Sequence, residues 1–181
     1  TSGFGGPRMP FLGDSAITRH SAVSSGQGSL LAVIDIGSNS VRLVVAQVLQ
    51  GGGLRVLNEQ REATRLASRL ASSGRLDQRA IVRTIGALRK FQEILSRFPL
   101  TQLRTFATCA VREAENGPQF CARVLAEVGL HVEVISGDQE GMYAFTSVHH
   151  AFNVSDQDIA VADIGGGSTE ILLSKQGEVE A

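Results

Sequence analysis

The sequence predicts an α/β fold in which helices pack on a mixed sheet. From Leu30 to about Phe152, strand and helix patterns follow one another in the order β-β-β-α-β-α-β-α, which is typical of such a unit. One strand-turn-strand signature also occurs twice, at residues 31–45 and 159–173. A chain of 181 residues has room for one good-sized domain, or for one domain and part of another. Together these observations predict a complete first unit followed by the start of a second.

The repeated signature is a buried apolar strand that ends in a lone carboxylate, Asp35 in the first copy and Asp163 in the second. Each copy then turns through glycine and hydroxyl residues and leaves as another apolar strand. Glycine lets the backbone approach a ligand closely, and consecutive N–H groups in a turn form an anion-binding concavity. Because a carboxylate beside such a concavity repels an anion, a metal ion is expected between them. Two matching copies favour a clamp on a phosphate chain with a divalent cation over two ordinary hairpins.

The elements at the start of the chain follow from composition and periodicity. Residues 1–29 are rich in Gly, Ser, Pro and Thr without sustained periodicity, so we expect a disordered leader. The strands of the first signature end near Leu49. A glycine-rich turn at residues 50–53 then leads to a third strand of a meander at Leu54–Asn58.

The middle of the chain predicts two helices separated by strands. Asp77 is a suitable cap for a helix that reaches about Phe98 and stops at Pro99. Its apolar stripe consists of Ile81, Ile85, Leu88, Phe91 and Leu95. A strand at Leu103–Thr108 follows, then a helix from Asn116 to Gly129 with Phe120, Val124 and Val128 inward. Residues 131–135 alternate as a strand.

The sequence Ser136-Gly137-Asp138-Gln139 has the form of a capping box. It would open a helix that reaches about Phe152 and connects the first unit to the second signature. The residues on its buried side are expected to be Gly141, Phe145, Val148 and Phe152.

Composition and charge exclude several classes of protein. The net charge of −1 argues against a general nucleic-acid binder. No apolar run is long enough to span a bilayer, and no secretory signal is visible. The cysteines, Cys109 and Cys121, have no metal-ligand spacing and predict reduced thiols in a cytosolic protein. Between Arg55 and Arg112 there are twelve Arg or Lys residues against four acids. Most of these basic residues are expected on solvated helix faces, with a polyanion-binding patch as the alternative for a few.

Glu140 is the candidate catalytic residue, because it lies in the first turn of the helix between the two units. A carboxylate there could hold and deprotonate a water aligned on a terminal phosphate, and the helix N-terminus should keep it ionised. On spacing alone, a surface acid that favours the helix N-terminus is the stronger interpretation. Arg112 follows a buried strand, where ligands gather in such folds. It could neutralise a phosphoryl oxygen or simply pair with Glu113 or Glu115.

The two turns offer hydroxyl and amide donors to a phosphate: Ser38, Asn39, Ser40, Ser168 and Thr169. For any one of them a structural role is an equal alternative. Cys109 is not expected to act as a nucleophile, since no His lies near it in sequence and a buried thiol is the common case. The adjacent His149 and His150 point to different faces of a helix and do not predict a metal site.

With these residues in view, the chain resembles the exopolyphosphatase / guanosine pentaphosphate phosphohydrolase (Ppx/GppA) family from about Leu31 to Leu173. The motifs that carry the resemblance are Ala-Val-Ile-Asp-Ile-Gly-Ser-Asn-Ser at 32–40, Ala-Thr-x-Ala-x-Arg-x-Ala-x-Asn at 107–116, Val-Ile-Ser-Gly-Asp-Gln-Glu at 134–140 and Asp-Ile-Gly-Gly-Gly-Ser-Thr-Glu at 163–170. The Asp-Ile-Gly-Ser-Asn-Ser form separates this family from actin and the kinases.

The resemblance implies an actin-like ATPase (ribonuclease H-like) fold. Residues 30–137 would form the complete first lobe and residues 138–153 a linking helix. Residues 154–181 would begin the second lobe with its first hairpin. Because the family's second domain continues well past Ala181, we expect this chain alone to be inactive.

The resemblance also implies roles for individual residues. Glu140 matches the family's catalytic glutamate, Asp35 and Asp163 match its magnesium-binding acids, and Arg112 matches an arginine at the substrate cleft. The residues that match its two phosphate loops are Gly37, Ser38, Asn39, Ser40, Gly165, Gly166, Gly167, Ser168 and Thr169.

The implied activity is release of the terminal phosphate of inorganic polyphosphate or of guanosine pentaphosphate by Mg²⁺-assisted attack of water. The alternative is a non-catalytic regulator that binds polyphosphate or guanosine polyphosphate. A kinase or filament protein of the same superfamily would need an adenosine site in the rest of the second lobe. We expect a cytoplasmic protein, a homodimer at full length, with no nucleic-acid or membrane partner.

The chain departs from the family pattern in one loop and at two helical positions, Gly141 and Ser147, of which Ser147 stands where Gly is usual and is expected to be tolerated. Family members commonly have Arg-Leu-Gly-x-Gly-Leu where this chain has Arg-Leu-Ala-Ser-Arg-Leu at residues 65–70. The loss of both glycines is expected to stiffen the loop or to move it out of the cleft, with an effect on substrate preference. Gly141 stands where Ala is usual, which we expect to be tolerated.

Overall fold

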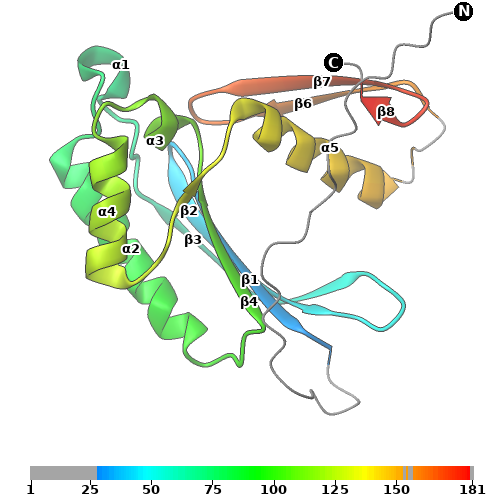
Figure 1. Ribbon diagram of the computed structural model, residues 1–181, viewed down its shortest axis with the longest axis horizontal. Helices are drawn as coiled ribbons and strands as arrows, with labels where there is room; N and C mark the ends of the chain where they lie inside the picture. Colours follow the sequence, from blue (N-terminus) through cyan, green and yellow to red (C-terminus); the bar gives the residue numbers. More distant parts are fainter. Residues whose placement is uncertain (1–27, 153, 155–156, 180–181) are drawn as a thin grey trace, which may run out of the picture.

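The computed structural model of the chain describes residues 28–152, 154 and 157–179. Of the expected leader, residues 1–27 lie outside the described part. Figure 1 shows a larger sheet with helices beside it and a smaller sheet accompanied by one long helix. No described helix is long and apolar enough to cross a membrane.

The larger sheet has the strand order β3-β2-β1-β4-β5. Strands β1 (Leu30–Ile36), β2 (Ser40–Val48) and β3 (Leu54–Ala63) form an antiparallel meander. On the other side of β1, β4 (Gln102–Ala107) pairs in parallel with β1, and β5 (Glu133–Val134) pairs in parallel with β4. This arrangement confirms the predicted α/β class. Ile36 at the end of β1 pairs with Ala107 at the end of β4. The residues that follow both strands therefore emerge at the same edge of the sheet.

Two strands differ in length from the prediction. β3 continues past Asn58 to Ala63, which pairs with Ser40. The added residues 59–62 are polar and carry no apolar alternation, so only their pairing with β2 defines them as strand. β5 has two residues where residues 131–135 were expected.

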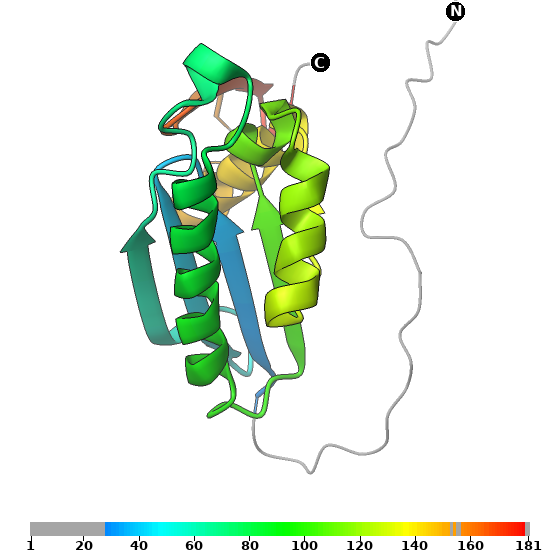
Figure 2. The same cartoon turned by 90° about the vertical axis from the view of Figure 1, so that its left-hand side faces the viewer.

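Helices α2 (Gln78–Leu95) and α4 (Gly117–Val128) cover one face of the larger sheet (Figure 2). The Asp77 carboxylate caps α2 as predicted, because it accepts hydrogen bonds from the backbone N–H groups of Arg79 and Ala80 at 3.0 and 3.2 Å. The whole predicted stripe of α2 is buried: Ile81, Ile85, Leu88, Phe91 and Leu95. α2 ends before Phe98, and Gly129 ends α4 in a left-handed conformation, φ +76°.

Two short helices were not predicted, α1 (Leu70–Ser73) and α3 (Cys109–Glu113). The loop before α1 lies against the β1–β2 turn, since the Ala67 N–H donates to the Ser38 carbonyl at 3.0 Å. Neither Ala67 nor Arg69, which stand where the family has glycines, needs a positive φ. The loop is thus held against the first turn without its glycines, and its effect on substrate preference stays a prediction.

Helix α5 (Gly137–Phe152) packs against the smaller sheet, which contains β6 (Ile159–Ile164), β7 (Thr169–Lys175) and β8 (Glu178–Val179). Its capping box is confirmed in both directions. The Ser136 N–H donates to Gln139 Oε1 at 3.0 Å, and the Gln139 N–H donates to Ser136 Oγ at 3.1 Å. The expectation for Phe152 was wrong, because this side chain is 72% exposed at the end of the helix.

Gly141 is buried on the face of α5 that packs on β7. A Cβ at this position would collide with Leu172 Cδ1, so an Ala would require the Leu172 side chain to move. The absence of a side chain at Gly141 thus sets how closely α5 approaches β7. This packing holds the first turn of α5 near the turn between β6 and β7.

Candidate functional site

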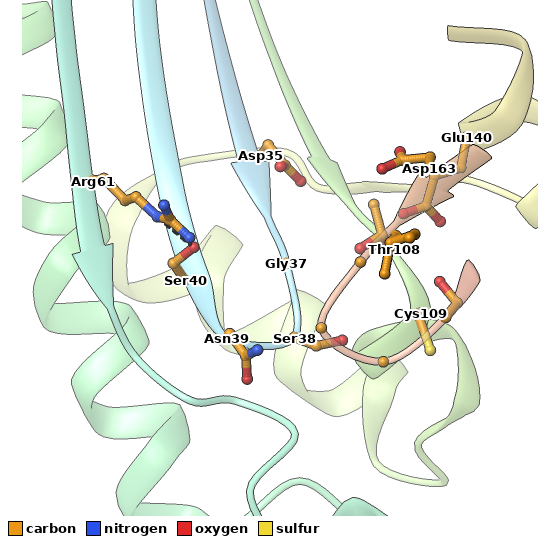
Figure 3. Close-up of a pocket in the computed structure, with 15 residues that line it drawn as sticks. Asp35, Gly37, Ser38, Asn39, Ser40, Arg61, Thr108, Cys109, Glu140 and Asp163 are labelled. Carbon is orange, nitrogen blue, oxygen red and sulfur yellow. Dashed lines mark hydrogen bonds between the residues drawn. The ribbon is translucent and has the colours of Figure 1, made fainter. Parts of the chain in front are cut away.

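Two strand turns face each other across a polar cavity of about 350 Å³ (Figure 3). One connects β1 to β2 and the other connects β6 to β7. Their backbones follow the same pattern, because the Gly37 N–H donates to the Ser40 carbonyl and the Gly165 N–H to the Ser168 carbonyl, both at 3.0 Å. The repeated signature in the sequence therefore becomes a repeated turn in space, and both copies open into one cavity.

Most of the residues predicted for the site line this cavity: Asp35, Gly37, Ser38, Asn39, Ser40, Glu140, Asp163, Gly165, Gly166, Gly167 and Ser168. Arg112 and Thr169 do not line it. Thr169 is exposed at the start of β7. The cavity also contains four residues that the sequence argument missed: Arg61, Thr108, Cys109 and Ile164.

The glycines of the second turn allow the two turns to touch. A Cβ at Gly167 would lie 2.5 Å from Ser38 Oγ and 3.2 Å from Cys109 Sγ, and a Cβ at Gly166 would collide with the Asn39 side chain. At Gly37 the nearest atom would be the carbonyl of Ser40, 3.2 Å away within the same turn. The sequence predicted that glycine in these turns allows close approach of a ligand. In the second turn it also permits close contact between the two halves of the cavity.

Asp35 and Asp163 occupy matching places at the ends of β1 and β6 and are drawn in Figure 3. Burial raises the pKa of Asp35, Arg42 lowers it, and the negative charge of Asp163 raises it again, with a net increase. Two carboxylates therefore influence each other across the cavity. A cation between them would relieve this repulsion.

Glu140 lies in the first turn of α5, and its side chain is 16% exposed. Burial raises the pKa of Glu140, and a hydrogen bond from Arg112 lowers it. The negative charges of Glu170 and Asp163 raise the pKa further, so that it lies above its ordinary value. The sequence argument expected the helix N-terminus to keep this group ionised, and burial acts in the opposite direction. The alternative of an exposed surface acid is wrong, because the side chain faces the cavity.

Arg112 sits in the last turn of α3, next to Glu140. Its Nη1 lies 3.3 Å from Glu140 Oε2 and donates to the Ile135 carbonyl at 2.9 Å, while its Nε donates to Glu113 Oε1 at 3.3 Å. The alternative partner Glu115 pairs instead with Arg75. Arg112 therefore orients the Glu140 carboxylate and does not itself reach the cavity wall.

Thr108 and Cys109 reach the cavity because β4 runs parallel to β1 and its end lies beside Asp35. Their place after a buried strand, in the same stretch as Arg112, is the signal that could have identified them. Glu170 was also missed. It pairs with Asp163 across β6 and β7, and its Oε2 is buried without a hydrogen-bond partner among the described residues. A buried, unpartnered carboxylate oxygen is unusual and marks a place for a cation or a proton.

No group of three His, Cys, Asp or Glu residues in the described part of the chain is arranged to hold a metal ion by itself. The carboxylates of Asp35, Asp163 and Glu140 nevertheless line one cavity. Mg²⁺ is bound through one or two carboxylates, several waters and substrate phosphates, not by a closed protein cage. The donor types present fit such an ion.

A second cavity of about 540 Å³ adjoins the first, with Asp35, Thr108, Glu140 and Asp163 common to both. Its other walls are largely apolar and include Val33, Phe106, Ile135 and Tyr143. The Phe106 and Tyr143 rings are 5.8 Å apart, and the Arg104 guanidinium lies 4.7 Å from the Phe106 ring centre. This cavity has a different chemistry from the polar one and could take a flat or apolar group.

The sequence and the fold were compared with known proteins. A sequence profile of the Ppx/GppA phosphatase family matches residues 32–181. The chain is 34% identical over 150 residues to "Exopolyphosphatase 1" of Mycobacterium tuberculosis (strain ATCC 25618 / H37Rv) and of Mycobacterium bovis. The aligned region covers 83% of this chain and 44% of those proteins. The chain thus spans less than half the length of these curated relatives.

Solved structures give the same result. The Aquifex aeolicus member of the Ppx/GppA family has 38% identity and a TM-score of 0.75, with 84% of this chain and 49% of that chain covered. An exopolyphosphatase from Cytophaga hutchinsonii has 28% identity and a TM-score of 0.78, with 83% and 48% covered. These matches confirm the actin-like ATPase fold expected from the motifs. The chain belongs to the Ppx/GppA phosphatase family.

Proposed function

We propose that the protein containing this chain is a phosphohydrolase that releases the terminal phosphate of inorganic polyphosphate by attack of water. The observation that carries the proposal is the pair of matching turns, which open into one polar cavity beside a buried glutamate. Family membership and the similarity to exopolyphosphatases support the same substrate. The turns provide the anion site, and Glu140 provides the base.

Different residues of the chain bind the phosphate, activate the water and orient the base in the proposed reaction. Backbone N–H groups in the two turns, with the side chains of Ser38, Asn39 and Ser168, donate to phosphoryl oxygens. Glu140 holds the attacking water and takes its proton. Because burial raises the pKa of Glu140, the carboxylate is a stronger base than an exposed glutamate. Arg112 acts through Glu140 by fixing its orientation.

Asp35 and Asp163 would hold a Mg²⁺ ion. The nearby negative charge of Glu170 raises the pKa of Glu140. When bound, the ion would neutralise charge on the phosphoryl oxygens as the bond to the leaving phosphate breaks. Asp35 and Asp163 lie at the ends of two different sheets. A shared ion would therefore also hold the two halves of the cavity together.

Guanosine pentaphosphate is a second candidate substrate, and the apolar second cavity is the observation that favours it. Phe106 and Tyr143 could stack on a base while the phosphates enter the polar cavity. A non-catalytic regulator would bind the same ligands without turnover. The buried Glu140 favours the enzyme, since a binding protein needs no base at this position.

The test is phosphate release by the full-length protein from long-chain polyphosphate, guanosine pentaphosphate and ATP, measured in parallel with Mg²⁺ and with a chelator. We expect release from polyphosphate with Mg²⁺ and none in chelator. Glu140→Gln should reduce turnover roughly 10²–10⁴-fold, which is the usual contribution of a general base, while polyphosphate still binds. Turnover within a few-fold of the parent would remove Glu140 from the mechanism. Binding without any release would establish the regulator instead.

A further inference from the structure

A third cavity, of about 420 Å³, continues from the phosphate cavity along the outer strands of the larger sheet. Asn39, Ser40 and Arg61 line both cavities, and the third cavity adds Ala63 and Arg65. Figure 3 shows Arg61 on β3, reaching towards Ser40 of the first turn. A phosphate chain whose end lies between the two turns could therefore pass along Arg61 towards Arg65.

These two arginines have no acidic partner among the described residues. The basic side chains of the same segment that do form ion pairs are Arg75, Arg89, Lys90, Arg104 and Arg112. Five other arginines of this segment also have no ion pair within the described chain, but they line neither the phosphate cavity nor the third cavity: Arg55, Arg69, Arg79, Arg83 and Arg97. Two guanidinium groups without a carboxylate thus occur together where the cavity continues.

The sheet register adds to the local excess of positive charge. Arg61 pairs directly with Arg42 across β2 and β3, and like charges at such positions destabilise a sheet. Arg42 is compensated by Glu59, with Nη2 and Oε1 2.6 Å apart. Arg61 instead donates from Nε to Ser40 Oγ at 3.1 Å, and its two terminal nitrogens have no partner among the residues that the structure describes. An anion beside Arg61 would supply the missing negative charge.

The backbone holds Arg65 against the first turn in an unusual conformation. Arg65 has φ +50°, a left-handed value that a residue with a side chain adopts at an energetic cost. The N–H groups of Thr64 and Arg65 both donate to the Asn39 carbonyl, at 3.1 and 2.9 Å. Arg83 fixes the Thr64 carbonyl with two further hydrogen bonds, at 3.2 and 3.0 Å. The position of Arg65 is therefore tied to the turn that faces the terminal phosphate.

We propose that Arg61 and Arg65 form a second phosphate subsite, which binds phosphate groups further along the chain than the one that is cleaved. The inference rests on the proposed phosphohydrolase function. A guanidinium presents several N–H donors in one plane and matches the oxygens of a phosphate group. Arg61 lies where the two cavities meet and contacts the phosphates next to the terminal one, whereas Arg65 contacts only more distant ones. The subsite thus makes binding depend on chain length.

The test compares the dissociation constants of long-chain polyphosphate and pyrophosphate by calorimetry. The full-length protein carries Glu140→Gln so that the probes are not consumed. Arg65→Asn removes the charge and suits a left-handed φ, since Asn is enriched there. We expect it to weaken long-chain binding about tenfold or more, as for loss of a hydrogen bond to a charged group. Pyrophosphate binding should change less than about twofold.

Three control variants make the result specific. Arg65→Lys keeps a positive charge and should recover part of the long-chain affinity. Arg61→Gln should weaken both probes, because Arg61 lines both cavities. Arg97→Gln removes an unpaired arginine in the turn between α2 and β4, at the other end of the sheet, and should change neither probe.

The outcomes separate this subsite from the proposed function. An equal loss on both probes with Arg65→Asn, or no loss on either, would overturn the subsite even if the parent protein hydrolyses polyphosphate. A loss confined to guanosine pentaphosphate, measured as a third probe, would overturn the assignment to polyphosphate. If the parent binds polyphosphate without hydrolysing it, the proposed function fails, while a chain-length-specific loss with Arg65→Asn still supports the subsite.

Discussion

The β1–β2 and β6–β7 hairpins have the same turn and the same register, but very different surroundings. Asp35 pairs with Arg42 in the first, and Asp163 pairs with Glu170 at the same spacing in the second. In the first hairpin Ile36 and Leu43 are fully buried. The matching residues of the second, Ile164 and Ile171, are 79% and 68% exposed. The comparison teaches that the sequence of the signature determines the turn, whereas the elements packed around it determine its burial.

The two hairpins also differ in the charge opposite each carboxylate. The first places Arg42 beside Asp35, and this arginine lowers the pKa of Asp35. The second places Glu170 beside Asp163, with one Glu170 oxygen buried and unpartnered. The first hairpin is therefore partly neutralised by the protein itself. The second contributes most of the uncompensated negative charge that a cation would have to balance.

The difference in burial predicts the largest effect. In this chain, backbone amides of β1 should exchange hydrogen roughly 10³-fold more slowly than those of β6, because β1 opens only with the core, whereas β6 is an edge strand of the small three-stranded sheet, whose Ile164 and Ile171 are exposed. Hydrogen exchange followed by mass spectrometry measures both at once. A dilution series is the control, since exposed apolar strands can also be protected by pairing with another chain. Equal protection in a monomer would contradict the prediction.

The contact between the turns predicts the next effect. Gly167→Ala would place a Cβ against Ser38 Oγ and Cys109 Sγ and force the turns apart. We expect kcat/KM of the full-length enzyme to fall about 10²-fold, as for a displacement of roughly 1 Å at a reacting centre. Gly37→Ala should have a smaller effect, because its Cβ would meet only the carbonyl of its own turn.

Adding Ser38→Ala to Gly167→Ala provides the matched control for that prediction. Because Ser38 is also a proposed phosphate donor, Ser38→Ala alone is the baseline. On that background the oxygen that the new Cβ would meet is absent, so Gly167→Ala should cost less activity than it does in the parent. Thermal unfolding of each variant shows whether the fold is intact. An equal loss from Gly167→Ala on both backgrounds, in folded variants, would mean that Gly167 is needed for the phosphate itself and not for contact between the turns.

Local signals in the sequence predicted the local features of the site. The capping box at Ser136 and Gln139 and the cap at Asp77 were predicted at the correct residues, because each depends on a few consecutive residues. Arg61 was missed for the opposite reason. It lies in the polar part of β3, which is a strand only because it pairs with β2. Arg112 does not line the polar cavity, and its expected role at the substrate cleft stays a prediction. Its contacts with Glu140 and Ile135 depend on how α3, β5 and α5 meet, which no local sequence signal gives.

The shared cation predicts a smaller, paired effect. Asp35→Asn and Asp163→Asn should each raise the Mg²⁺ concentration needed for half-maximal activity roughly tenfold or more, because each removes one carboxylate from the cavity. Titration of activity with Mg²⁺ in the full-length protein measures this directly. A change in only one of the two variants would contradict a cation held by both hairpins.

The charges around Glu140 predict the smallest effect, and its sign can be worked out. The acidic limb of the kcat/KM profile reports the pKa of the base in the free enzyme, and the pKa of Glu140 lies above its ordinary value of 4.5. Arg112 stabilises the ionised carboxylate, so Arg112→Gln should raise this pKa and move the limb to higher pH. Glu170→Gln removes a neighbouring negative charge and should move the limb to lower pH. Both profiles are measured at saturating Mg²⁺. Shifts in the same direction, or none, would show that another group is the titrating base.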